Sequence, residues 1–403
     1  MKASQQTVRL RLAEPLRISR STMAARDAVW LAVEHEARIG HGEAVTSTYY
    51  GLDAQTLGRL CAEAGRELAR FAEPESALDA LRSGGLRCAQ GPPAVTAAVD
   101  SALLDLVGKR ALRPVHQLLG ATEPPRAATA RTLGIGAPAE AARTAARLAA
   151  AGFTTLKIKA GSADPADDLD RVAAVQVAAP GAELLLDPNG AWSLAQARAL
   201  LPRFAALGVT AVEQPLAPGD PEALARLAAT SPLPVIADED AVGLADARRL
   251  AGRVHGINVK LAKCGGPSAA LRLAEAVEGS GTALMLGCLT ASSLGLAPAV
   301  HLAGRARWTD LDGHLLLAHD PWTGIGGEHG VVAASRLPGL GVRRRTPGDP
   351  SPGDRALGNP SPGNRAPGDP SPGDRALGDP SPGDPSPGDP TPGSPPPENR
   401  AAA

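Results

Sequence analysis

Five ionisable residues stand at the ends of five successive apolar runs in the middle of this chain. They are Lys159, Asp187, Glu213, Asp238 and Lys260, and the intervals between them are 28, 26, 25 and 22 residues. Each interval has the length of one strand followed by one helix, which predicts a parallel sheet with crossover helices. Because the carboxyl ends of such strands face the same side, we expect the five side chains to converge on one cavity.

The same alternation predicts the fold class. Strands are expected at 153–160, 182–187, 209–213, 233–238, 256–260 and 282–287, with Ala/Leu/Arg-rich helical segments between most of them. The number of units, over roughly 200 residues, favours a closed βα barrel of the TIM type over an open doubly wound sheet. The open sheet is the alternative, but no GxGxxG motif follows any of these strands. We predict an α/β barrel.

The regions on either side of the barrel have different patterns. Residues 7–50 alternate in the manner of strands, and helices are expected near 54–72 and 94–110, which indicates an α+β domain. From residue 346 the chain consists of near-copies of PSPGD, a composition too poor in apolar residues to offset the entropy of ordering. We therefore predict a disordered tail over 346–403, whose role the sequence does not give.

Composition argues against several classes of function. The chain has 41 basic and 42 acidic residues and only 2% aromatic residues, so neither nucleic acid nor a membrane surface is an expected partner. Its four cysteines lack a zinc-ligand spacing, and no apolar window is long enough to span a membrane. No apolar core resembling a signal peptide stands at the N-terminus, so we expect a cytoplasmic protein that binds a small molecule. The oligomeric state stays open, a homo-oligomer being one option.

The residue types at the strand ends predict their chemistry. Three carboxylates that share one cavity repel each other and call for a proton or a cation. An all-oxygen ligand set favours a hard ion, so we predict Mg²⁺, with Mn²⁺ tolerated, bound by Asp187, Glu213 and Asp238. Glu239 is an alternative third ligand.

The lysines complete this chemistry. Lys157 and Lys159 share a strand face, so we expect each amine to lower the pKa of the other and to allow a neutral base near pH 7. Lys260 lies three units further along and approaches from across the barrel. A base on each face of a metal-stabilised enediolate is what inversion at a carbon requires.

These motifs resemble the enolase superfamily, and within it the muconate-lactonizing subgroup. The resemblance covers about residues 7–340 and rests on KIK at 157–159, LLLDPNGAW at 184–192, VEQP at 212–215, ADE at 237–239 and NVKLAKCGG at 258–266. It implies a modified (β/α)₈ barrel at 119–320, an N-terminal α+β capping domain at 1–118 and a C-terminal segment, 321–345, that returns to the capping domain. It also implies that Lys159 and Lys260 form the acid/base pair and that Lys157 supports the substrate carboxylate. Lys263 is the less favoured base.

Three further segments are similar to parts of the dipeptide epimerases of this superfamily. TDLDGHLLLAHDPWTGIGG at 309–327 resembles a segment whose carboxylates, here Asp310 and Asp312, bind the substrate ammonium. ISRST at 18–22 resembles a loop whose arginine meets an acidic side chain of the substrate, which implicates Arg20 or, as an alternative, Arg26. ARTLG at 130–134 matches a segment with a substrate-contacting threonine, Thr132.

One position departs from the pattern of the Ala-Glu epimerases. GCLTASS at 287–293 has Ala291 where many of them carry a glutamate, which weakens the transfer of Ala-Glu preference. The resemblance thus implies a Mg²⁺-dependent dipeptide epimerase that transfers a proton between the two faces of an α-carbon. The alternatives within the same superfamily are an N-acylamino acid racemase, an o-succinylbenzoate synthase and a muconate cycloisomerase. The preferred dipeptide and the pathway are not implied.

Overall fold

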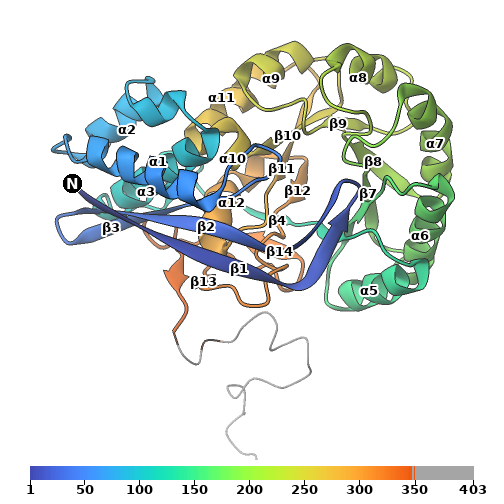
Figure 1. Ribbon diagram of the computed structural model, residues 1–403, viewed down its shortest axis with the longest axis horizontal. Helices are drawn as coiled ribbons and strands as arrows, with labels where there is room; N and C mark the ends of the chain where they lie inside the picture. Colours follow the sequence, from blue (N-terminus) through green and yellow to red (C-terminus); the bar gives the residue numbers. More distant parts are fainter. Residues whose placement is uncertain (347–348, 350–403) are drawn as a thin grey trace, which may run out of the picture. The chain divides into compact units, whose positions relative to one another are not determined.

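The computed structural model describes residues 1–346 and 349 of the chain (Figure 1). The predicted disordered tail at 346–403 therefore lies outside the described residues, apart from positions 346 and 349. No helix in the described part is long and apolar enough to cross a membrane.

The N-terminal part is an antiparallel three-stranded sheet packed against helices. Its elements are β1 (Lys2–Ile18), β2 (Ser21–His35), β3 (Arg38–Val45), α1 (Ala54–Leu68), α2 (Pro74–Arg82), the 3₁₀ turn η1 (Arg87–Gln90), α3 (Pro93–Arg110) and α4 (Val115–Leu118). The register between β1 and β2 shifts between Arg11 and Leu16, where Pro15 has no N–H to donate to the ladder. Helix α1 begins at a cap, because the Asp53 side chain accepts a hydrogen bond from Thr56 N.

Helix α3 lies between this sheet and the barrel, and it is buried along almost its whole length. Gly40 and Gly42 of β3 allow its close approach, since a Cβ at either position would lie about 2 Å from a carbonyl oxygen of α3, at 2.1 and 2.0 Å. Two buried aspartates of α3 then connect the helix to other parts of the chain. Asp100 accepts hydrogen bonds from Ser268 N and Oγ of the barrel, and Asp105 accepts one from Leu340 N. The capping helix is thus tied to both the barrel and the C-terminal segment.

Eight parallel strands form the barrel in chain order. They are β5 (Arg131–Leu133), β6 (Thr155–Lys159), β7 (Glu183–Asp187), β8 (Val209–Glu213), β9 (Val235–Ala237), β10 (Gly256–Lys260), β11 (Ala283–Gly287) and β12 (Trp308–Asp310). Neighbours pair from β5 to β12, and a hydrogen bond of 2.8 Å from Ala130 N to Thr309 O brings the first strand back to the last. The predicted barrel is confirmed.

Helices cover the outside of this sheet, most visibly from α5 to α9 (Figure 1). They are α5 (Pro138–Ala150), α6 (Pro165–Ala178), α7 (Leu194–Ala206), α8 (Pro221–Ala228), α9 (Leu244–Leu250), α10 (Leu261–Cys264), α11 (Pro267–Val277) and α12 (Ser293–Val300), followed by the 3₁₀ turn η2 (Ala303–Arg305). The strand–helix turns carry the expected start signals. Asp164 and Asp220 cap helices that begin with proline, and Ser193 forms a capping box with Gln196.

The barrel interior is filled by a separate apolar cluster, and the C-terminal segment runs back over the N-terminal part. The cluster contains Ala130, Leu185, Ala211, Ile236, Met285 and Trp308. Four short strands, β4 (Arg126–Ala128), β13 (Trp322–Thr323), β14 (Val331–Ala333) and β15 (Arg343–Arg344), pair as β14 with β4 and β13 with β15. A hydrogen bond from Val115 N to Gly339 O joins this segment to the capping domain, and one from Ala318 N to Arg11 O joins the capping domain to the end of the barrel range. The boundaries at 118, 320 and 345 stay predictions.

Candidate active site

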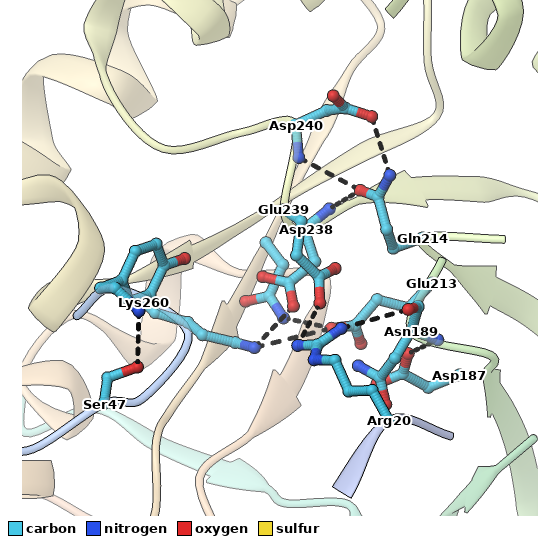
Figure 2. Close-up of polar contacts among 12 residues, drawn as sticks. Arg20, Ser47, Asp187, Asn189, Glu213, Gln214, Asp238, Glu239, Asp240 and Lys260 are labelled. Carbon is cyan, nitrogen blue, oxygen red and sulfur yellow. Dashed lines mark hydrogen bonds and ion pairs between the residues drawn. The ribbon is translucent and has the colours of Figure 1, made fainter. Parts of the chain in front are cut away.

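The five residues predicted from their spacing do meet at one end of the barrel. Lys159, Asp187, Glu213 and Lys260 are each the last residue of their strand, and Asp238 follows β9 directly. All five side chains are buried. Figure 2 shows Asp187, Glu213, Asp238 and Lys260 gathered around a common centre. The alternation of strand and helix therefore places these charges in one site.

Lys157 occupies the centre of the carboxylate group. Its Nζ lies 2.7 Å from Glu213 Oε2, 3.0 Å from Asp187 Oδ2 and 2.8 Å from Asp310 Oδ2. Burial lowers the pKa of Lys157, but these three carboxylates outweigh burial and raise the pKa well above its ordinary value. The expectation of a lowered pKa is therefore wrong for Lys157, because the three carboxylates around its ammonium outweigh burial.

Lys159 and Lys260 are held on different sides of this centre. Lys159 Nζ lies 2.5 Å from Asp187 Oδ2, and Lys260 Nζ lies 2.7 Å from Asp238 Oδ2 and 3.9 Å from Glu213 Oε1. The strands that carry the two lysines, β6 and β10, are separated by three strands in an eight-stranded barrel. Burial lowers the pKa of Lys260, but Asp238 and Glu213 outweigh it and raise the pKa. The two amines thus flank the carboxylates from opposite walls.

The three predicted metal ligands differ in their electrostatic surroundings. Burial opposes the ionisation of Asp187 and Asp238, but the lysines beside each one hold its pKa below the ordinary value. Burial and the charge of Asp187 raise the pKa of Glu213 to about 7. Asn258 supports Glu213 by donating from Nδ2 to Oε1 at 2.8 Å. Gly287 of the adjacent strand makes room for Asn258, because a Cβ there would lie 2.4 Å from Asn258 Oδ1.

Lys263 and Gln214 fix the strand end that carries Asp238. Lys263 Nζ donates to Asp238 O at 2.6 Å and to Asp238 Oδ1 at 2.5 Å, so both of these hydrogen bonds go to one residue. Gln214 Oε1 accepts from Asp238 N and from Asp240 N, while Gln214 Nε2 donates to Asp240 Oδ2 at 2.7 Å (Figure 2). The Asp238 carboxylate is thereby held between two ammonium groups, one on each oxygen.

Asp310 and Asp312, predicted to bind an ammonium, both enter the site. Asp310 is bound to Lys157 through Oδ2, whereas Asp312 Oδ2 accepts hydrogen bonds from Arg131 Nη1 at 3.1 Å and from Thr132 N at 2.8 Å. Thr132 thus contributes its backbone amide here. Asp310 Oδ1 is buried and has no hydrogen-bond partner among the described residues.

Arg20 reaches the mouth of the barrel from the turn between β1 and β2. Its Nη2 lies 2.7 Å from Glu239 Oε1, and its Nη1 donates to Asn189 O at 3.1 Å (Figure 2). Burial lowers the pKa of Arg20, but Glu239 outweighs it and raises the pKa. Arg26, the alternative, donates to Thr46 O and to Met23 Sδ, and burial lowers its pKa to about 10.

The donor chemistry of the site fits a hard cation. Its buried side-chain atoms without a hydrogen-bond partner include the oxygens Asn189 Oδ1, Glu239 Oε2 and Asp310 Oδ1, so acceptors are in excess. Within the described residues, however, no three His, Cys, Asp or Glu side chains are grouped closely enough to hold a metal ion. Each predicted ligand is instead turned towards a lysine ammonium or an amide. The ligand atoms are therefore oxygens of the kind that Mg²⁺ binds, but they are paired with ammonium and amide groups here.

Several members of this site were missed from the sequence. Asn258 lies two positions before Lys260 on β10, so the period of two could have placed it on the same face. Arg131 immediately precedes Thr132, but nothing in its local sequence indicates a bond to Asp312. A contact outside the site was missed as well: Glu43 of the capping domain accepts a hydrogen bond from Ser292 N at 2.9 Å, at the start of α12. That contact joins positions 249 residues apart, beyond the reach of any local pattern.

The site has two opposed lysines around buried carboxylates, at the carboxyl end of a barrel that an α+β domain covers. These features define a class of barrel proteins suited to proton transfer at carbon. Two family models match the chain: Mandelate racemase / muconate lactonizing enzyme, N-terminal domain, over residues 2–120, and Enolase C-terminal domain-like, over residues 140–346. The chain therefore belongs to the mandelate racemase/muconate lactonizing enzyme family of the enolase superfamily.

Among known proteins and solved structures, several similar chains are dipeptide epimerases. The chain is 33% identical to a hydrophobic dipeptide epimerase of Roseobacter litoralis, over 85% of this chain and 98% of the relative. It is also 33% identical to the L-Ala-D/L-Glu epimerase of Escherichia coli K12, over 76% and 91% of the two chains. A dipeptide epimerase from Enterococcus faecalis V583, solved with Mg and L-Leu-L-Tyr, superimposes with a TM-score of 0.80 at 29% identity, covering 85% of this chain and 98% of that one.

Proposed function

We propose that the chain is a Mg²⁺-dependent dipeptide epimerase that inverts one α-carbon by two-base proton transfer. The observation that carries this proposal is the placement of Lys159 on β6 and Lys260 on β10, on opposite walls of the barrel around one group of carboxylates. The dipeptide epimerases among its relatives, and the solved relative with bound Mg and dipeptide, support the substrate class.

The reacting carbon would lie between the two lysines. One amine, neutral at that moment, takes the proton from the α-carbon, and the C–H electron pair moves into the substrate carboxylate. The ammonium on the other wall then gives its proton to the opposite face of the same carbon, so that the configuration is inverted. Lys157 lies among the carboxylates and would hold the substrate carboxylate by charge.

Asp187, Glu213 and Asp238 are the residues proposed to hold Mg²⁺. When bound, the ion supplies positive charge that stabilises the second negative charge on the substrate carboxylate. Glu239 is the alternative to Asp238, because its Oε2 atom is buried without a partner. Mn²⁺ is the proposed substitute, since the ligand set is made of oxygen atoms alone.

The remaining substrate residues are proposed from their positions in the mouth. Asp310 and Asp312 would bind the ammonium of the first residue, with Asp310 Oδ1 as the buried acceptor that lacks a partner. Thr132 lies beside Asp312, and Arg20 lies above the carboxylates at the entrance.

A second candidate is an N-acylamino acid racemase, whose substrate has no ammonium. It is favoured by the fact that Asp310 and Asp312 already pair with Lys157 and Arg131. The two candidates share the proton chemistry and differ only in what the first residue's amino group contacts.

A library experiment tests the proposal. The enzyme would be incubated with Mg²⁺ in D₂O, with a set of dipeptides and a matched set of N-acetyl and N-succinyl amino acids, and the products read by mass. We expect one deuterium at a single α-carbon of at least one dipeptide, with the signal lost in EDTA and restored by Mg²⁺. Turnover of an N-acyl amino acid without uptake by any dipeptide would contradict the dipeptide proposal and favour the second candidate.

A further inference from the structure

Arg171 and Asp168 form a buried ion pair on α6, beside the strand end that carries Lys159. The side chain of Arg171 is 1% exposed and that of Asp168 is fully covered, and among the described residues no other arginine is classed as buried. A buried ion pair adds little net stability, because the loss of hydration offsets most of the attraction between the charges. The role of this pair therefore depends on the groups that it binds.

Arg171 binds the backbone at two strand ends. Its Nη2 donates to Lys159 O, the last carbonyl of β6, at 3.0 Å, and its Nη1 donates to Gly136 O, in the loop after β5, at 3.3 Å. Because the guanidinium is planar and rigid, these two bonds fix one carbonyl relative to the other. Arg171 therefore ties the strand that carries a proposed base to the neighbouring strand.

Asp168 binds the loop that follows Lys159. Its Oδ2 accepts hydrogen bonds from Gly161 N at 2.7 Å and from Ser162 N at 3.0 Å, and its Oδ1 accepts one from Ser162 Oγ at 2.6 Å. The loop also packs tightly on the next one, since a Cβ on Gly161 would approach Ala191 Cβ to 2.6 Å. The backbone on the carboxyl side of Lys159 is thus held at several points.

This backbone support matters because the side-chain contact of Lys159 depends on charge. Lys159 Nζ lies 2.5 Å from Asp187 Oδ2, and that ion pair exists only while the amine is protonated. Asp187 is also a proposed ligand of Mg²⁺, whose charge would compete with the ammonium. The bonds from Arg171 to Lys159 O and Gly136 O depend on neither event, because they involve no proposed metal ligand and no titrating group of Lys159.

Lys260, the second proposed base, is supported in another way. Helix α10 begins at the next residue, Leu261, so the helix itself fixes the end of β10. Residues 160–164, by contrast, lie between Lys159 and the first residue of α6. Within the described part of the chain, neither Arg171 nor Asp168 forms a hydrogen bond with Lys260. A defect in the ion pair should therefore disturb one wall of the site and spare the other.

We propose that Arg171, held by Asp168, positions Lys159 for proton transfer at one face of the α-carbon. The inference rests on the proposed function, and it makes Arg171 a positioning residue that does not touch the reacting atoms. A lysine at this position keeps a positive charge opposite Asp168 but lacks the planar fork that reaches both carbonyls. Arg171→Lys therefore removes the support of Lys159 O without leaving a buried carboxylate unpaired.

The test separates the two faces of the α-carbon. Arg171→Lys would be added to Lys260→Ala, in which Lys159 is the remaining base, and to Lys159→Ala, in which Lys260 remains. Exchange of the α-proton would be measured in D₂O with Mg²⁺, using the separated epimers of the dipeptide that the library identifies as the best substrate. We expect Arg171→Lys to slow exchange about 10–100-fold in Lys260→Ala, and by less than about twofold in Lys159→Ala, because only Lys159 is misplaced.

Arg249→Lys is the matched control. Asp246 and Arg249 on α9 have the same spacing as Asp168 and Arg171, with 2.8 Å between Arg249 Nη2 and Asp246 Oδ1. Asp246 also accepts hydrogen bonds from the backbone of the preceding loop, at residues 242 and 243. Arg249, however, is 47% exposed and bonds to Asp246 rather than to a strand end. Its replacement should leave the exchange rates of both single-lysine variants unchanged.

Each other outcome has a defined meaning. Equal slowing in both single-lysine variants, slowing in neither, or no exchange in either one while the wild type epimerises would overturn this inference. Should thermal unfolding show that Arg171→Lys does not fold, Ser162→Ala, which removes a hydroxyl bound to Asp168, should slow exchange in Lys260→Ala alone, and any other pattern would overturn the inference. A wild type that turns over no dipeptide would overturn the proposed function itself.

Discussion

At the scale of single residues, the two lysines near Asp238 are distinguished by their contacts. Lys260 ends a strand and binds Asp238 Oδ2, whereas Lys263 lies one helical turn later and binds Asp238 Oδ1 and O. Because both of these hydrogen bonds go to Asp238, we infer that Lys263 positions this candidate metal ligand. Lys260 also approaches Glu213 and is proposed as the acid/base residue.

A Lys263→Met variant tests this distinction. Asp238 would keep Lys260 but lose its second ammonium, so we expect a fall in kcat/KM of about 10–100-fold, with a matching rise in the Mg²⁺ concentration needed for half-maximal activity. Deuterium should still enter both epimers of the substrate. Exchange into only one epimer would show instead that Lys263 carries the proton, and thermal unfolding of the variant would check that the fold is intact.

What the sequence predicts at this scale depends on backbone periodicity. The strand period of two and the length of one strand–helix unit suffice to bring Lys157, Lys159, Asp187 and Lys260 to one place. The pairing of Arg20 with Glu239, 219 residues away, follows from two long side chains crossing between domains, and no periodicity describes it. The raised pKa of Lys157 was missed for a different reason: the expectation considered the second lysine and burial, but not the carboxylates at the same end of the barrel, of which Asp187 has the largest effect.

At the scale of elements, a buried histidine joins α4, α12 and the C-terminal segment. His301 Nδ1 accepts a hydrogen bond from His116 N at 3.0 Å, and its Nε2 lies 3.1 Å from Leu340 O, which it can reach only as a donor. These partners fix the neutral ring. Burial, opposed only in part by the hydrogen bond to Leu340, lowers the pKa of His301 to about 4.

This depressed pKa predicts a loss of stability in acid. An unfolded histidine takes up its proton near pH 6.5, whereas folded His301 does so near pH 4, so its contribution is complete above pH 6.5 and falls as pH falls through that window. We expect about 2 kcal/mol of unfolding free energy to be lost between pH 6.5 and 5 through this group. Urea titrations at several pH values should show this loss of unfolding free energy in the wild type but not in His301→Gln. An equal dependence of the unfolding free energy on pH in both proteins would contradict the role given to His301.

The predictability of the elements follows their length. The five-residue strands β6, β7, β8, β10 and β11 carry apolar runs that predict them, and so does the three-residue β9, whereas β5 and β12 are three residues long and carry no such run. Helix α2 was not predicted, and the helix expected at 54–72 ends at Leu68. Short elements here are ordered by their neighbours in the barrel and by the helices packed on it, which local sequence does not describe.

At the scale of the whole described chain, closure of the barrel places the two lysines on opposite sides of the site. The lysines of β6 and β10 oppose each other only because β5 and β12 meet through Ala130 N and Thr309 O. The capping domain adds Arg20 and Tyr49 above the same mouth. Fold class and the site's position were therefore predictable from strand order, while contacts between the two parts, such as that of Arg20 with Glu239, were not.

The central claim is that Lys159 and Lys260 act on opposite faces of one α-carbon, and single-lysine variants test it most directly. Lys159→Ala and Lys260→Ala would each be given the separated epimers of the best dipeptide with Mg²⁺ in D₂O, with Lys2→Ala, an exposed lysine, as the control. We predict that each variant loses epimerisation but exchanges the α-proton of one epimer, and that the two variants exchange opposite epimers. Near-normal epimerisation by either variant, or exchange of the same epimer by both, would contradict the two-base account.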